Sequence, residues 1–109
     1  MSPAAAFAAL ADPTRAAIVE LLAHRGELAA GEIGAEFTSS ASAISQHLKV
    51  LREAGLVTVE KRAQQRVYRL DPTALGAAGG WLSDRSRQWN ARVDALAAHI
   101  EKTRDQGAL

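Results

Sequence analysis

Residues 40–57 read SASAISQHLKVLREAGLV and carry the plainest structural signal in the chain. Ser40 is a typical helix N-cap, because its hydroxyl oxygen can accept from a backbone N–H that has no partner in the first turn. Three apolar residues then recur at positions i, i+4 and i+7, as on the buried face of an amphipathic helix: Ile44, Leu48 and Leu51. Gly55 follows where a glycine commonly ends a helix. The pattern predicts a helix over residues 41–54.

The opposite face of this helix is polar. With the apolar stripe turned to the core, four side chains point outward: Ser42, Ser45, Gln46 and Lys49. Gln can bond N6 and N7 of adenine together, Ser can donate or accept at any base, and an alanine methyl can pack on a thymine methyl. The helix is therefore predicted to read the major groove of double-stranded DNA. The expected base contacts come from Ser42, Ala43, Ser45 and Gln46.

Shorter helices are expected before this one. Residues 4–10 favour a short helix, and Asp12 followed by proline marks the N-terminus of a second, which should end at Gly26. A third, over residues 30–37, precedes the turn at Thr38–Ser40. Two helices around a short turn are typical of a helix-turn-helix, in which the first helix braces the second.

A hairpin, the wing, is expected over about residues 56–70, where the hydrophobic period becomes alternating. Its polar tip has long basic or amide side chains that suit a phosphate or a minor groove. Expected contacts with the DNA backbone, from the helix and the wing together, are Ser40, His47, Lys49, Arg62, Gln64, Gln65, Arg66 and Arg69.

The charges agree with this assignment. Residues 1–40 hold two basic and five acidic residues, whereas residues 41–70 hold six basic and two acidic ones, in a chain of net charge +1. A concentration of positive charge in one region is the footprint of a surface that approaches phosphates.

A long helix is expected over about residues 80–104, and the glycines before Trp81 leave an earlier start undecided. Its apolar residues fall seven, four, three and four apart, a spacing close to a coiled-coil seam: Leu82, Trp89, Val93, Leu96 and Ile100. Trp81 and Trp89 either fill a core or dimer interface or line an effector pocket, and both interpretations stay open.

Length and composition exclude several classes of protein. A chain of 109 residues fits a single domain, and the absence of cysteine excludes disulfides and thiolate metal sites. We find no signal peptide and no apolar run of about 18 residues, so a cytoplasmic location without membrane contact is expected. No catalytic motif is present, and Ser45 and His47, two apart on a helix, point in different directions. We expect neither an enzyme nor a cofactor.

Three segments together resemble the ArsR-type winged-helix repressors: ALADPTR at residues 9–15, SQHLKVLREAGLV at 45–57 and YRL at 68–70. The likeness covers about residues 5–104, and the long tail with Trp81 and Trp89 resembles a metal-independent branch of the family. It implies a winged helix-turn-helix of about five helices, mainly α with a small β-hairpin. It also implies a homodimer that occludes a promoter, often its own, at an inverted repeat. The implied dimer interface joins the first and last helices through Phe7, Leu10, Leu82, Trp89, Val93, Leu96 and Ile100.

The sequence also departs from this family. Metal-sensing members place cysteines on the bracing helix, and residues 29–37 have none here. The last helix offers Asp84, Asp94, His99 and Glu101 without the paired carboxylate and His arrangement of other members, so no metal site is expected. A small apolar effector between the last helices stays open. The alternative function is a winged-helix module that binds protein rather than a specific DNA sequence.

Overall fold

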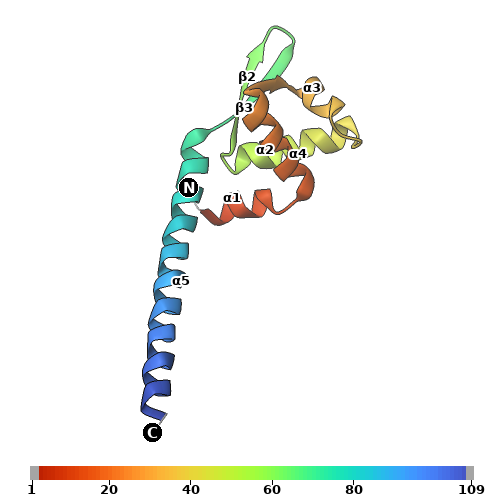
Figure 1. The fold of residues 1–109 in the computed structure, drawn as a ribbon. Coiled ribbons are helices and arrows are strands. Elements are labelled where there is room, and N and C mark those ends of the chain that lie inside the picture. The colour runs from red at the N-terminus through yellow and green to blue at the C-terminus, as the bar shows by residue number, and fades with distance from the viewer. Residues whose placement is uncertain (1–2, 108–109) are drawn as a thin grey trace. The chain divides into compact units, whose positions relative to one another are not determined.

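The computed structural model describes residues 3–107. In chain order the elements are α1 (Pro3–Leu10), α2 (Pro13–Arg25), β1 (Glu27–Ala29), α3 (Ala30–Ala35), α4 (Ala41–Glu53), β2 (Val57–Arg62), β3 (Gln65–Leu70) and α5 (Pro72–Gly107) (Figure 1). The predicted class, five helices with a small β-hairpin, is confirmed. No helix in the described range is long and apolar enough to cross a membrane.

Side chains on both sides fix the turn between α1 and α2. The Asp12 carboxylate accepts from the backbone N–H of Arg15 at 3.0 Å, and Pro13 opens α2 as the sequence predicts. This hydrogen bond holds the pKa of Asp12 below its ordinary value. The Arg15 side chain turns back and donates from Nε to the carbonyl of Ala9 at 2.6 Å. One short motif therefore ends α1 and begins α2.

The amphipathic helix α4 has the two ends that its sequence predicts. The Ser40 hydroxyl accepts from the backbone N–H of Ala43 at 3.1 Å. At the other end Gly55 adopts a φ of +77°, a conformation that only glycine reaches without strain. The N–H of Leu56 then bonds the Leu51 carbonyl at 3.0 Å, so carbonyls of the last turn are satisfied.

The core lies where α2, α3 and α4 meet the sheet. Its largest fully buried side chains come from these helices and from the residue before β2: Ile18, Leu22, Ile33, Leu48, Leu51 and Leu56. No polar or charged residue is buried among the described residues. The core is therefore apolar throughout, and polar groups remain for the surface.

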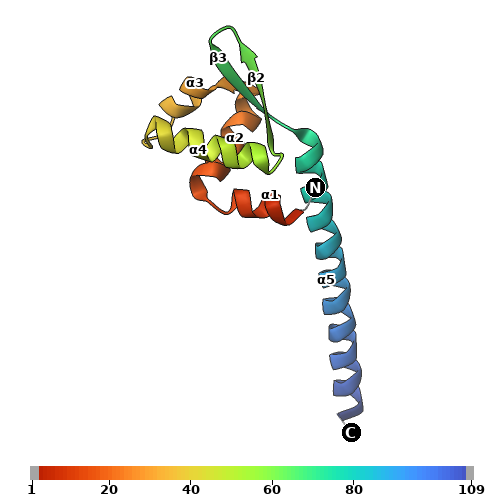
Figure 2. The same ribbon diagram turned by 180° about the vertical axis from the view of Figure 1, so that it is seen from behind.

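The wing belongs to a three-stranded antiparallel sheet in the order β1-β3-β2. β1 pairs with the base of β3, from Glu27 opposite Arg69 to Ala29 opposite Val67. Beyond this point the hairpin has only two strands, and its outermost pair is Arg62 opposite Gln65. The tip extends past the neighbouring helices in both views (Figure 1 and Figure 2).

Two helices differ in length from the prediction. α3 ends at Ala35, and Phe37 packs against the core from the turn that follows. α5 begins at Pro72, because the Asp71 carboxylate accepts from the backbone N–H of Thr73 at 2.9 Å and proline suits the first helical position. Asp71 and Pro72 therefore start α5, and the helix continues through the glycines that follow.

By internal contacts the chain divides into a compact unit that ends at Ala78 and a second unit that begins at Gly79. The first turns of α5 belong to the compact unit, where Ala74 and Ala78 are buried. In the second unit, large apolar side chains of α5 are exposed: Trp81, Leu82, Trp89, Val93, Leu96 and Ile100.

Candidate nucleic-acid interface

Helix α4 separates its side chains as an amphipathic helix should. Ile44, Leu48 and Leu51 are at most 3% exposed and belong to the core. On the opposite face the four polar side chains named from the sequence are exposed, and Ala43 beside them is half-buried: Ser42, Ser45, Gln46 and Lys49. The burial of one face therefore leaves a continuous polar row for a partner.

A groove of about 350 Å³ lies between α4 and the wing. Its walls are formed by Ala30, Ser45, Leu48, Lys49, Arg52, Arg66 and Tyr68. Three of these side chains are cationic, and they come from two separate elements, α4 and β3. The groove therefore brings positive charge from the helix and from the hairpin to one concave surface, as a polyanion requires.

Two further hollows adjoin this groove. One, of about 420 Å³, lies between the tip of the wing and the start of α3: Ala29, Ala30, Gly31, Gln64, Gln65 and Arg66. The other, of about 290 Å³, lies between α3 and α4 and includes Ser45. Each shares Ala30 with the groove, so the three form one concave strip across α3, α4 and the wing.

His47 lies beside this row rather than in it. Its side chain is 21% exposed, and Nδ1 is 3.8 Å from the Asp12 carboxylate at the start of α2. The carboxylate that begins α2 therefore also lies near the middle of α4. His47, expected from the sequence to contact the DNA backbone, thus has a carboxylate of its own chain nearby.

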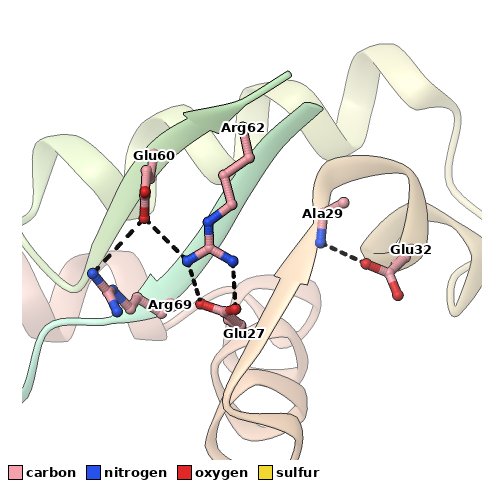
Figure 3. A network of polar contacts seen from close by, with 6 residues as sticks. All are labelled: Glu27, Ala29, Glu32, Glu60, Arg62 and Arg69. Atoms are coloured by element: carbon pink, nitrogen blue, oxygen red, sulfur yellow. Dashed lines mark hydrogen bonds and ion pairs between the residues drawn. The ribbon is translucent and has the colours of Figure 1, made fainter. Parts of the chain in front are cut away.

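The base of the wing holds a network of opposite charges (Figure 3). Arg62 donates to both carboxylate oxygens of Glu27, at 2.6 and 3.1 Å, and to Glu60 at 3.1 Å. Arg69 lies 4.0 Å from the same Glu60 carboxylate. The contact with Arg62 lowers the pKa of the Glu27 carboxyl, and the two carboxylates raise the pKa of Arg62. Arg62 is thus engaged within the protein.

Other cations of the middle segment have no such carboxylate. Within residues 3–107, no ion pair forms at Lys49, Arg52, Lys61 or Arg66. Lys49, Arg52 and Arg66 all line the groove. Three of these four uncompensated cations therefore lie on the concave strip.

Comparisons with known proteins agree with this geometry. A helix-turn-helix domain family matches residues 10–60. The chain is 46% identical over 104 residues to the HTH-type transcriptional regulator Rv2034 of Mycobacterium tuberculosis. This match covers 95% of this chain and 94% of the relative. It is 32% identical to the arsenical resistance operon repressor of Escherichia coli, over 96% of this chain and 90% of that one.

A solved structure, the ArsR-like transcriptional regulator from Rhodococcus sp. RHA1, matches with a TM-score of 0.75 at 30% identity. The match covers 86% of this chain and 88% of that one. The chain belongs to the ArsR-type winged-helix regulators. It is a DNA-binding transcriptional regulator, and the alternative of a protein-interaction module is not favoured. The relatives compared here are regulators rather than enzymes.

In this ArsR-type regulator the bracing helix α3 reads AGEIGA and offers no metal-binding side chain except Glu32. The Glu32 carboxylate is already used, because it accepts from the backbone N–H of Ala29 at 2.9 Å (Figure 3). Within residues 3–107, no three His, Asp or Glu side chains are placed to hold a metal ion.

The structure brings five of the twelve DNA contacts named from the sequence to the groove and the hollow at the tip of the wing. Ser45, Lys49 and Arg66 line the groove, and Gln64 and Gln65 line the hollow next to it. Arg69 lies instead at the base of the wing, and Arg62, the last residue of β2, turns its guanidinium back to Glu27 there. Arg52, Tyr68 and Ala30 line the groove without having been named as contacts. The sequence could have indicated Arg52 as a further contact, because it is basic and follows Lys49 by three residues on the same helix.

Proposed function

We propose that this regulator binds operator DNA as a homodimer and represses transcription, with α4 in the major groove. The observation that carries the proposal is the division of α4 into a buried apolar face and an exposed polar row beside a cationic groove. The proposed base contacts are Ser42, Ala43, Ser45 and Gln46. Chromosomal DNA as a ligand implies a cytoplasmic location.

Phosphate contacts are proposed for the uncompensated cations Lys49, Arg52 and Arg66. The amides Gln64 and Gln65 at the tip of the wing, and the Ser40 hydroxyl at the start of α4, supply neutral contacts to the backbone or the minor groove. Arg69, at 58% exposure, stays a proposed backbone contact near the base of the wing.

The dimer is proposed on the exposed seam of α5. Leu82, Trp89, Val93, Leu96 and Ile100 are 44–64% exposed, although their spacing is that of a coiled coil. A second copy of α5 supplies the matching apolar surface. Phe7 and Leu10 of α1, which pack partly against the core, are proposed to extend this interface. Two recognition helices then meet half-sites about 34 Å apart on one face of the duplex.

The proposal is tested by footprinting the protein on the DNA upstream of its own coding region. One protected inverted repeat is expected. At that site Gln46→Ala should relax the preference at one base pair by about 1–3 kcal/mol per half-site, because the amide can bond two atoms of one base. Gln106→Ala, the same change at an exposed position of α5, is the matched control.

Two results contradict the proposal. Unchanged operator affinity in Gln46→Ala rules out the assigned base contacts. A strictly monomeric protein in light scattering, across the concentrations used for binding, rules out the dimer.

A further inference from the structure

The two arginines of the wing lie in different surroundings. Arg66 lines the groove beside α4 together with Tyr68. Arg62 pairs in the ladder with Gln65, whereas Arg66 pairs with Lys61. Because successive side chains of a strand point to opposite faces, Arg62 and Arg66 lie on opposite faces of the hairpin. The groove is thus on the face of Arg66, and the carboxylates of Glu27 and Glu60 are on the face of Arg62.

Arg62 links the outermost strands of the sheet. It is the last residue of β2, and it reaches the carboxylate of Glu27 on β1, the strand on the far side of β3 (Figure 3). The contact is bidentate, the geometry in which arginine and carboxylate bind most strongly. Glu60 adds a third hydrogen bond at 3.1 Å. We call the contact between Arg62 and Glu27 the latch.

We propose that the latch positions the wing for DNA, and that Arg62 is a positioning residue rather than a phosphate contact. The inference rests on the proposed DNA-binding surface. Past Val67 the hairpin has two strands, and an isolated pair of strands is only marginally stable. The latch joins this outer part to β1 and so restrains the direction in which Arg66 points.

Charge balance supports the same assignment. Arg62, Arg69, Glu27 and Glu60 sum to zero, so the base of the wing exerts no net attraction on phosphates. A phosphate that took Arg62 would have to replace both Glu27 contacts and would lie close to the carboxylates left behind. An exposed single ion pair is worth little, but a cation shared by two carboxylates with good geometry forms a network.

The test separates the two roles by the salt dependence of binding to a random duplex, which requires no knowledge of the operator. Each lost phosphate contact makes the slope of log K against log salt shallower by about 0.9. Arg66→Gln should show this change. Arg62→Gln should leave the slope as in the wild type and weaken binding by about two- to fivefold per protomer, since the wing must then be ordered on binding.

Glu27→Gln should match Arg62→Gln in both readouts, and the double variant should be no weaker than either single one. Glu20→Gln is the matched control, because it makes the same change of charge on α2, where Glu20 forms no ion pair within residues 3–107. Thermal melting confirms that each variant is folded at the binding temperature.

Three results overturn the inference. A slope in Arg62→Gln as shallow as in Arg66→Gln identifies Arg62 as a phosphate contact. Tighter binding by Glu27→Gln than by the Glu20→Gln control shows that the latch withholds a cation instead of positioning the wing. Additive losses in the double variant show that the two residues act separately. If the wild type binds no duplex at all, the proposed DNA-binding function fails as well, which distinguishes that failure from the other three.

Discussion

Two helices of this regulator carry similar apolar stripes and meet different surroundings. On α4 the stripe of Ile44, Leu48 and Leu51 is at most 3% exposed. On α5 the seam residues from Leu82 to Ile100 are 44–64% exposed. Both patterns mark an amphipathic helix, but periodicity does not specify what covers the apolar face. The first stripe is covered by its own chain, and the second is exposed.

The burial of its apolar stripe also fixes the position of the polar face of α4. Three buried side chains and two capped ends hold the backbone of α4 in place and so fix where its outer residues begin. Ser42, Ser45, Gln46 and Lys49 are therefore placed before any ligand arrives. Pre-organisation of this kind reduces the entropy that binding has to supply.

The largest effect is expected from Leu48→Ala. Removing a fully buried leucine costs its transfer free energy and leaves a cavity, so the free energy of unfolding should fall by about 2–5 kcal/mol. Urea unfolding followed by circular dichroism measures it. A loss below about 1 kcal/mol would mean that α4 is not held as its burial indicates, and the contrast with α5 would then disappear.

Trp89→Ala on the α5 seam should act on assembly. Large aromatic side chains dominate interfaces, and their truncation commonly costs about 2 kcal/mol, equal to roughly a thirtyfold weaker dimer. Sedimentation equilibrium measures the dissociation constant. Asn90→Ala, next in sequence but off the seam, is the control and should leave it unchanged. Equal effects of both variants would argue against a seam.

Ser40→Ala should cost about 1 kcal/mol, because the Ala43 N–H then loses its cap. The change lies at the start of the recognition helix and leaves the α5 seam untouched. Urea unfolding should report the loss, while the dimer dissociation constant measured as for Trp89→Ala stays the same. A parallel weakening of the dimer would show that the two helices are not independent.

The smallest expected effect is a change in how the free energy of unfolding depends on pH. The pKa of Glu27 is lowered from its ordinary value of 4.5 by Arg62, so the unfolded chain binds a proton more readily than the folded one. The stabilisation is present above pH 4.5 and is lost as the pH falls through the lower folded value. Urea unfolding at a series of pH values should therefore show a smaller acid loss in Glu27→Gln. An identical pH profile in both proteins would contradict the assignment.

Local signals in the sequence were sufficient for much of the fold. Ser40, the apolar stripe and Gly55 define α4 because a cap, a period and a stop act within one helix. The start of α5 stayed undecided from the sequence because of the glycines before Trp81, and the signal from Asp71 and Pro72 lies upstream of them. The site was only partly predictable. The partner of Arg62 is Glu27, 35 residues away, and only the strand order β1-β3-β2 brings them together.

The junction between α4 and β2 determines how the regulator can be altered. Leu56 is fully buried, its N–H closes the end of α4, and its carbonyl accepts from Asp71 at 2.9 Å just after β3. An added residue at this junction would break all three arrangements and shift the strand register. The hairpin turn is different, because Ala63 there has a φ of +54° and no comparable set of bonds. Insertions are therefore best confined to the outer turn, with the spacer between helix and hairpin left at its present length.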